Sequence, residues 1–184
     1  MLEDSKSLPD IMTGVHGDYR WMTSTLHRID ELLALCPELV LGKYLAVTSC
    51  DSGPLNLRAE RHISGWESRA GIAYSPQITS FELLPPHSHY DEWYVLEAPV
   101  DLGGVASGVA GYEAIAGRVD VFVNSAQFIF DPGNEGVAEQ FWRQIESMRP
   151  YAYISEMDAC WLTVVCSDQK LHAAIEQKLR FSVH

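Results

Sequence analysis

The stretch PPHSHYDEWYVLE, residues 85–97, holds the side chains whose types and spacing come closest to a reactive site. His87 and His89 are separated by one residue, and Glu92 follows three positions later. Imidazole and carboxylate groups are ligands of Zn²⁺ and related cations. In an extended backbone, however, the two histidines share one face with Asp91 while Glu92 points to the other. The stretch is therefore either part of a metal site or the polar end of an ordinary strand.

The same stretch resembles the first histidine motif of the cupins, in which P-x-H-x-H is followed by a glutamate and then by a β-strand. The resemblance covers about thirteen residues. It implies a metal bound by His87, His89 and Glu92, with a further histidine supplied by a distant second motif. A small metal-dependent enzyme using this HxH motif is accordingly our alternative function.

Two departures from the cupin pattern favour the other interpretation. Cupins place three or four residues between the second histidine and the glutamate, whereas here Tyr90 and Asp91 alone intervene. Downstream, the chain has only His172 and His184, and neither lies in a P-x-G-x-x-H motif. We therefore predict that the protein needs no metal or other cofactor.

Motifs for nucleophilic or phosphate chemistry are incomplete. Ser64 and Ser107 lack the glycine two positions earlier that a nucleophile elbow requires. The small-residue run at 103–111 lacks the Gly-Lys-Ser/Thr ending of a phosphate-binding loop. Adjacent acids such as Asp91 and Glu92 acquire acid-base roles only through tertiary placement. The sequence therefore favours a non-enzymatic function over an enzymatic one, and we assign no catalytic residue.

The charge of the chain indicates which partners it can bind. The formal net charge is −12, from 13 Lys and Arg against 25 Asp and Glu. Nucleic acids and anionic membranes require clusters of basic residues, so neither is predicted as a partner. A basic protein fits this charge, and homo-oligomer formation stays open.

Aromatic and acidic residues in the middle of the chain supply a candidate binding surface. Tyr and Trp combine a large contact area with a polar group, which suits a protein interface. The candidate partner-binding residues are Trp66, Tyr90, Asp91, Glu92, Trp93 and Tyr112. Core packing is the alternative for Trp66 and Trp93. Our leading hypothesis is a non-enzymatic protein-binding protein of the inhibitor or immunity type.

The location we expect is cytoplasmic. The N-terminal residues MLEDSKSLPD are acidic and lack the basic and apolar regions of a secretory signal. No apolar run approaches the roughly 20 residues that cross a bilayer.

The fold we expect is a single α+β domain over residues 1–184, with 1–17 as a loosely ordered N-terminal segment. Its core is a largely antiparallel central sheet of about seven strands, packed with about three helices. Strands are expected at 43–50, 69–75, 78–84, 92–97, 119–124, 126–131, 151–155 and 160–166. Helices are expected at 18–36, at 134–150 with Asn134 as cap, and after a Ser167 cap. Residues 98–117 are expected to form a long loop or a poorly regular crossing.

The four cysteines are expected to be free. Cys36, Cys50, Cys160 and Cys166 form no C-x-x-C pair. The last two lie on one predicted strand, roughly 20 Å apart at about 3.3 Å per residue, and a disulfide needs Cα atoms within about 7 Å. Buried free thiols are therefore predicted.

Overall fold

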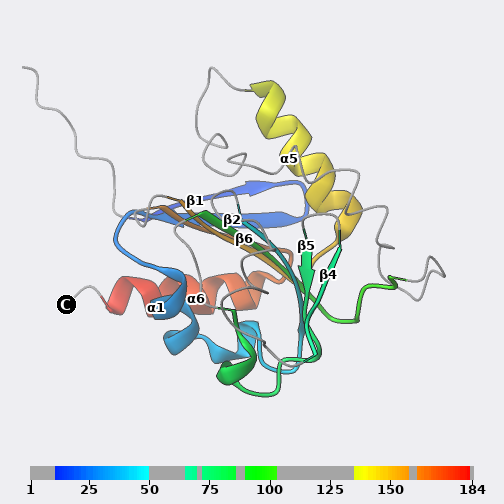
Figure 1. Cartoon of the computed structure of the whole chain (residues 1–184). Helices are drawn as coiled ribbons and strands as arrows, with labels where there is room; N and C mark the ends of the chain where they lie inside the picture. Colours follow the sequence, from blue (N-terminus) through cyan, green and yellow to red (C-terminus); the bar gives the residue numbers. More distant parts are fainter. Residues whose placement is uncertain are drawn as a thin grey trace, which may run out of the picture.

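A computed structural model describes residues 11–49, 65–69, 72–85, 90–102, 135–157 and 161–182. Eight strands in these ranges form one antiparallel sheet, in the order β1-β2-β8-β7-β6-β3-β5-β4 (Figure 1). The strands are β1 Ile11–His16, β2 Tyr19–Ser24, β3 Tyr44–Ser49, β4 Glu67–Arg69, β5 Ile72–Tyr74, β6 Tyr90–Leu96, β7 Ala152–Met157 and β8 Trp161–Cys166.

Helices cover both faces of this sheet. The α-helices of the described ranges are α1 Ile29–Leu35, α5 Glu135–Met148 and α6 Gln169–Phe181, with 3₁₀ turns η1 Pro37–Leu39 and η2 Phe81–Leu83. Figure 1 shows α1 and α6 on one face and α5 on the other. The predicted α+β fold with an antiparallel sheet is thereby confirmed. Within the described ranges, every helix is too short or too polar to cross a membrane.

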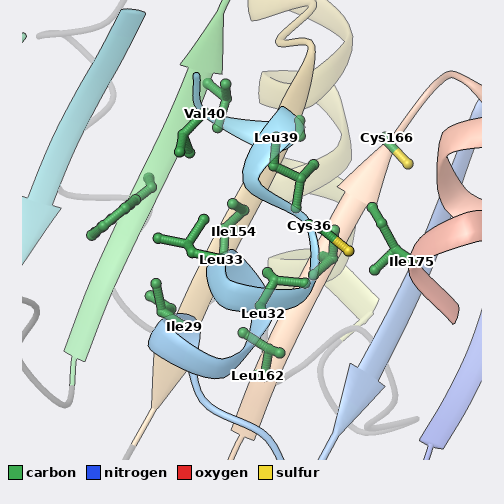
Figure 2. Close-up of a cluster of buried hydrophobic side chains, with 14 of the residues drawn as sticks. Ile29, Leu32, Leu33, Cys36, Leu39, Val40, Ile154, Leu162, Cys166 and Ile175 are labelled. Carbon is green, nitrogen blue, oxygen red and sulfur yellow. The ribbon is translucent and has the colours of Figure 1, made fainter. Parts of the chain in front are cut away.

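The larger core lies between the sheet and the pair α1 and α6. Ile29, Leu32 and Leu33 of α1 follow the three- and four-residue spacing of one helix face and are at most 5% exposed. Figure 2 shows these side chains together with Ile154 of β7 and Ile175 of α6. Burial of this apolar face holds a helix of seven residues that is too short to be stable alone.

The opposite core is aromatic and holds α5. Phe141 packs edge-on against Tyr153 with ring centroids 5.1 Å apart, and Tyr153 meets Tyr94 at the same distance. Ile145 and Met148 continue the buried face of α5. The predicted helix that ends before Pro150 is confirmed, with this face turned to the sheet.

The helix predicted over residues 18–36 is wrong in its first half, because that part forms β2 and α1 begins only at Ile29. Gly17 adopts φ +56°, the left-handed region that glycine tolerates, and so turns the chain into the β1–β2 hairpin. Met22 and Ile29 are both buried in the same core, one from a strand and one from a helix. The buried residues of a strand and of the following helix therefore happen to recur at helical spacing, which is why the sequence predicts one continuous helix.

The region of residues 69–84 also differs from the prediction. The strand expected at 78–84 is absent: Ile78 is a buried loop residue whose N–H donates to the Lys43 carbonyl at 2.8 Å, and η2 follows it. The strand expected at 69–75 is divided between β4 and β5. β5 and β6 are not neighbours in the sheet, because β3 lies between them and pairs with both.

Further boundaries differ at the ends of the chain. The segment 1–17 was expected to be loosely ordered, yet β1 is formed from Ile11 onward. The last helix is capped by Asp168 rather than Ser167, because the Asp168 carboxylate accepts the N–H groups of Lys170 and Leu171 at 2.8 and 3.2 Å. The strands predicted at 119–124 and 126–131, Asn134 and most of the segment 98–117 lie outside the described residues.

Cys36 and Cys166 are free and buried, as predicted, whereas Cys50 and Cys160 lie outside the described residues. Burial raises the pKa of Cys166 to about 12 and also raises that of Cys36. We expect both thiols to react slowly with a maleimide in the native protein and quickly in denaturant, because the thiolate is the reactive form. Peptide mapping of the labelled protein checks each cysteine separately. Fast native labelling of Cys36 and Cys166 would contradict their burial.

Candidate functional site

The structure places Glu92 and Trp93, two of the predicted partner-binding residues, in the interior. They are neighbours on β6, point to opposite faces, and are 2% and 1% exposed. Trp66 is half-buried against the larger core, and its indole N–H donates to the Leu83 carbonyl at 2.8 Å. Core packing therefore holds for Trp93 and largely for Trp66, and the burial of Glu92 and Trp93 removes them from the predicted surface.

The other predicted residues are not brought to a common site by the described part of the chain. Tyr90 and Asp91 contribute their backbone to β6, and their side chains are not described. Tyr112, His87 and His89 lie outside the described residues. Within the described ranges, no three His, Cys, Asp or Glu side chains gather in a way that would hold a metal ion. The metal interpretation of His87, His89 and Glu92 thus stays a prediction.

Glu92 belongs to a row of buried polar side chains on the sheet face that carries α5. Ser155, Thr163 and Thr23 continue the row on β7, β8 and β2, and all four residues are at most 2% exposed. Glu92 Oε1 accepts the Tyr153 hydroxyl at 2.7 Å, and the two threonine hydroxyls lie 3.4 Å apart. Glu92 Oε2 and Ser155 Oγ have no hydrogen-bond partner among the described residues. The interior is therefore polar at this level of the sheet.

Burial raises the pKa of Glu92 from the ordinary 4.5 to about 8, although the hydrogen bond from Tyr153 lowers it. Between these two values the folded state holds a proton that the unfolded state has released. Stability contributed by this group therefore falls as the pH rises from 4.5 to 8, and changes no further above that range.

Glu92→Gln removes this titration while keeping the side-chain shape. We expect the free energy of unfolding of the variant to rise relative to the native protein by on the order of 3 kcal/mol between pH 5 and pH 8.5. Urea unfolding of both proteins across this range measures the difference. A difference that does not change with pH would show that Glu92 titrates normally.

A second buried carboxylate, Glu156, positions α1 from the opposite face of β7. Its Oε2 accepts the N–H of Ile29 at 2.8 Å, and the residue is fully buried. Glu31 Oε2 accepts the N–H of Arg28 at 3.1 Å. Two carboxylates thus satisfy N–H groups that a helix start leaves without an intrahelical partner.

His27 links the start of α1 to the end of α6. Its Nδ1 lies 2.6 Å from Ser24 Oγ and its Nε2 lies 2.9 Å from Ser182 Oγ. The Ser182 hydroxyl donates to the Leu179 carbonyl at 2.9 Å and so accepts the Nε2 proton. Ser24 then donates to Nδ1 and accepts the N–H of Leu26 at 3.2 Å. Each proton of this network has an acceptor, so the network acts as a clamp between the start of α1 and the end of α6.

Two pockets open on either side of α1. The larger, of about 460 Å³, is lined by Leu26, His27, Glu31, Ala34, Leu35 and Ser182. The smaller, of about 240 Å³, is lined by Ile29, Asp30, Leu33, Ala34, Phe81, Leu84, Pro85 and Trp93. Ala34 belongs to both, so the outer ridge of α1 separates them. This arrangement was not predicted from the sequence, because the walls come from segments far apart in the chain.

The surface around these pockets combines exposed apolar side chains with acids. We call it the α1 face and define it by Leu26, Asp30, Glu31, Ala34, Phe81 and Glu82. Leu26 and Phe81 are 47% and 45% exposed. The α1 face carries three acidic side chains, and Arg28 at the start of α1 supplies one positive charge next to them.

Comparison of the chain with known protein families, with curated proteins and with solved structures gave no match.

Proposed function

We propose that this chain is a non-enzymatic binding protein that recognises a basic protein partner, as an inhibitor or immunity-type protein does. The observation that carries the proposal is the α1 face, where two apolar pockets adjoin Asp30 and Glu31. An apolar surface rimmed by polar residues is typical of an interaction surface. The acids favour binding of a partner whose apolar contact surface is surrounded by positive charge over one whose contact surface carries no positive charge.

The charge of the whole chain supports the same proposal. A net charge of −12 creates a long-range field that attracts a basic protein and accelerates its association. Burial of apolar surface at about 25 cal/mol per Å² then contributes affinity once the partners meet. In this proposal the charge determines which partner associates quickly, and apolar contact in the pockets stabilises the complex.

Affinity capture tests the proposed function. The full chain is immobilised and exposed to lysate of its source organism at low and high salt, and an unrelated protein of equal net charge serves as control. We expect a basic protein to be recovered on this chain alone and to bind it again after purification, with an association rate that falls as salt increases. Recovery of an acidic partner, or of none that binds again, would refute the proposal.

A further inference from the structure

We infer that the α1 face is the docking site for a basic amphipathic helix of the partner. This inference rests on the proposed function and extends it by naming the surface and the element that occupies it.

The shape of the α1 face suits a helix. A helix packs on another by placing its side chains in the grooves on either side of an exposed ridge. Ala34 forms that ridge with the smallest side chain that has a Cβ, and a pocket lies on each side of it. Apolar side chains three, four and seven positions apart on one helix face are therefore matched to this surface. The seven residues of α1 span about 10 Å, so about two turns of the partner make the contact.

The charges of the α1 face determine which residues of the partner helix can lie next to the apolar side chains that enter the pockets. Asp30 lines the smaller pocket and Glu31 lines the larger, so each anchor enters beside a carboxylate. The nearby Lys178 is already engaged: its ammonium group lies 3.0 Å from Glu38 and donates to the Leu35 carbonyl at 2.8 Å. Lys or Arg next to the anchors is favoured here, and Glu or Asp is repelled.

The site is held in shape before binding. Glu156 fixes the start of α1 through Ile29, and the His27 clamp joins Ser24 to Ser182 at the wall of the larger pocket. A surface that is already ordered loses little conformational entropy on association. The pockets therefore stay available to a partner without rearrangement of α1.

Two synthetic helical peptides of about 14 residues serve as probes. Both carry leucines at the same i, i+3, i+4 and i+7 positions, and the remaining positions hold Lys and Ala in one and Glu and Ala in the other. Amide NMR spectra of the isotope-labelled full chain report binding. We expect the Lys peptide to shift the amides of Leu26, Ala34 and Phe81 in a saturable way. We expect the Glu peptide to bind at least tenfold more weakly.

A matched pair of variants locates the contact. Ala34→Arg places a long cation on the ridge between the pockets, and we expect it to weaken the Lys peptide at least tenfold, which is about 1.4 kcal/mol. Val15→Arg makes a similar change at a residue that is 59% exposed near the far end of the β1–β2 hairpin, and should leave binding unchanged. Both positions are exposed, and circular dichroism of each variant verifies its fold.

The outcomes separate this inference from the proposed function. Absence of Lys-peptide binding, binding that Ala34→Arg leaves unchanged, or shifts confined to another surface would overturn the docking site. A basic partner recovered by affinity capture would still uphold the proposed function in each of these cases. If capture recovers no basic partner, the proposed function fails whatever the peptide does.

Discussion

Replacement of Val164 by aspartate should lower the free energy of unfolding by at least about 4 kcal/mol. Val164 is fully buried on β8, which lies between β7 and β2, and its cross-strand partners are Ile154 and Met22. A carboxylate at this position has an apolar cross-strand neighbour on both sides. Urea unfolding followed by circular dichroism measures the loss.

Ser167→Asp provides the control for this variant, because it adds the same charge at an exposed residue immediately after β8. We expect that change to stay within about 0.5 kcal/mol of the native protein. If Val164→Asp were as stable as Ser167→Asp, β8 could not be the buried centre of the sheet.

Phe141→Ala should destabilise the protein by about 3 to 5 kcal/mol. The ring is fully buried between α5 and the sheet, with centroids 5.0 Å from Trp142 and 5.1 Å from Tyr153. Its removal leaves a cavity and ends two edge-to-face ring contacts. Thermal unfolding measures the stability, and near-ultraviolet circular dichroism reports the loss of aromatic packing.

Gln140→Ala is the matched control, because the preceding residue of the same helix is exposed. We expect an effect within about 0.5 kcal/mol. Equal stability of the two variants would mean that α5 is not anchored to the sheet through Phe141.

The sequence was most informative where burial follows a local pattern. The apolar run WLTVVC predicts β8 because a central strand is covered on both faces, and the spacing of Leu171, Ile175 and Leu179 predicts α6. The error at residues 18–36 has a nonlocal cause. β2 is fixed by pairing with β8, and Met22 meets Val164 across 142 positions of sequence that local periodicity does not sample.

The candidate site was largely beyond the reach of sequence reasoning. The residue type of Glu92 predicts exposure, yet its environment is set by Tyr153, which is 61 residues away in the chain. The pockets of the α1 face likewise form only when α1, η2 and the end of α6 are placed together. The available signal for the buried row was a pair of adjacent polar residues within each strand, Asp91-Glu92 in β6 and Ser155-Glu156 in β7, and such a pair also fits the polar end of an ordinary strand.

The position of β8 between β2 and β7 has a consequence for folding kinetics. The β1–β2 hairpin closes locally, but its connection to the rest of the sheet is β8, which follows it by more than a hundred residues. On the ribosome, Met22 and Trp21 can therefore meet their β8 partners, Val164 and Val165, only after most of the chain has emerged. Such late pairing adds loop-closure entropy to the barrier and slows folding. The hairpin is then the part of the nascent chain whose apolar side chains are exposed longest to chaperones and to aggregation.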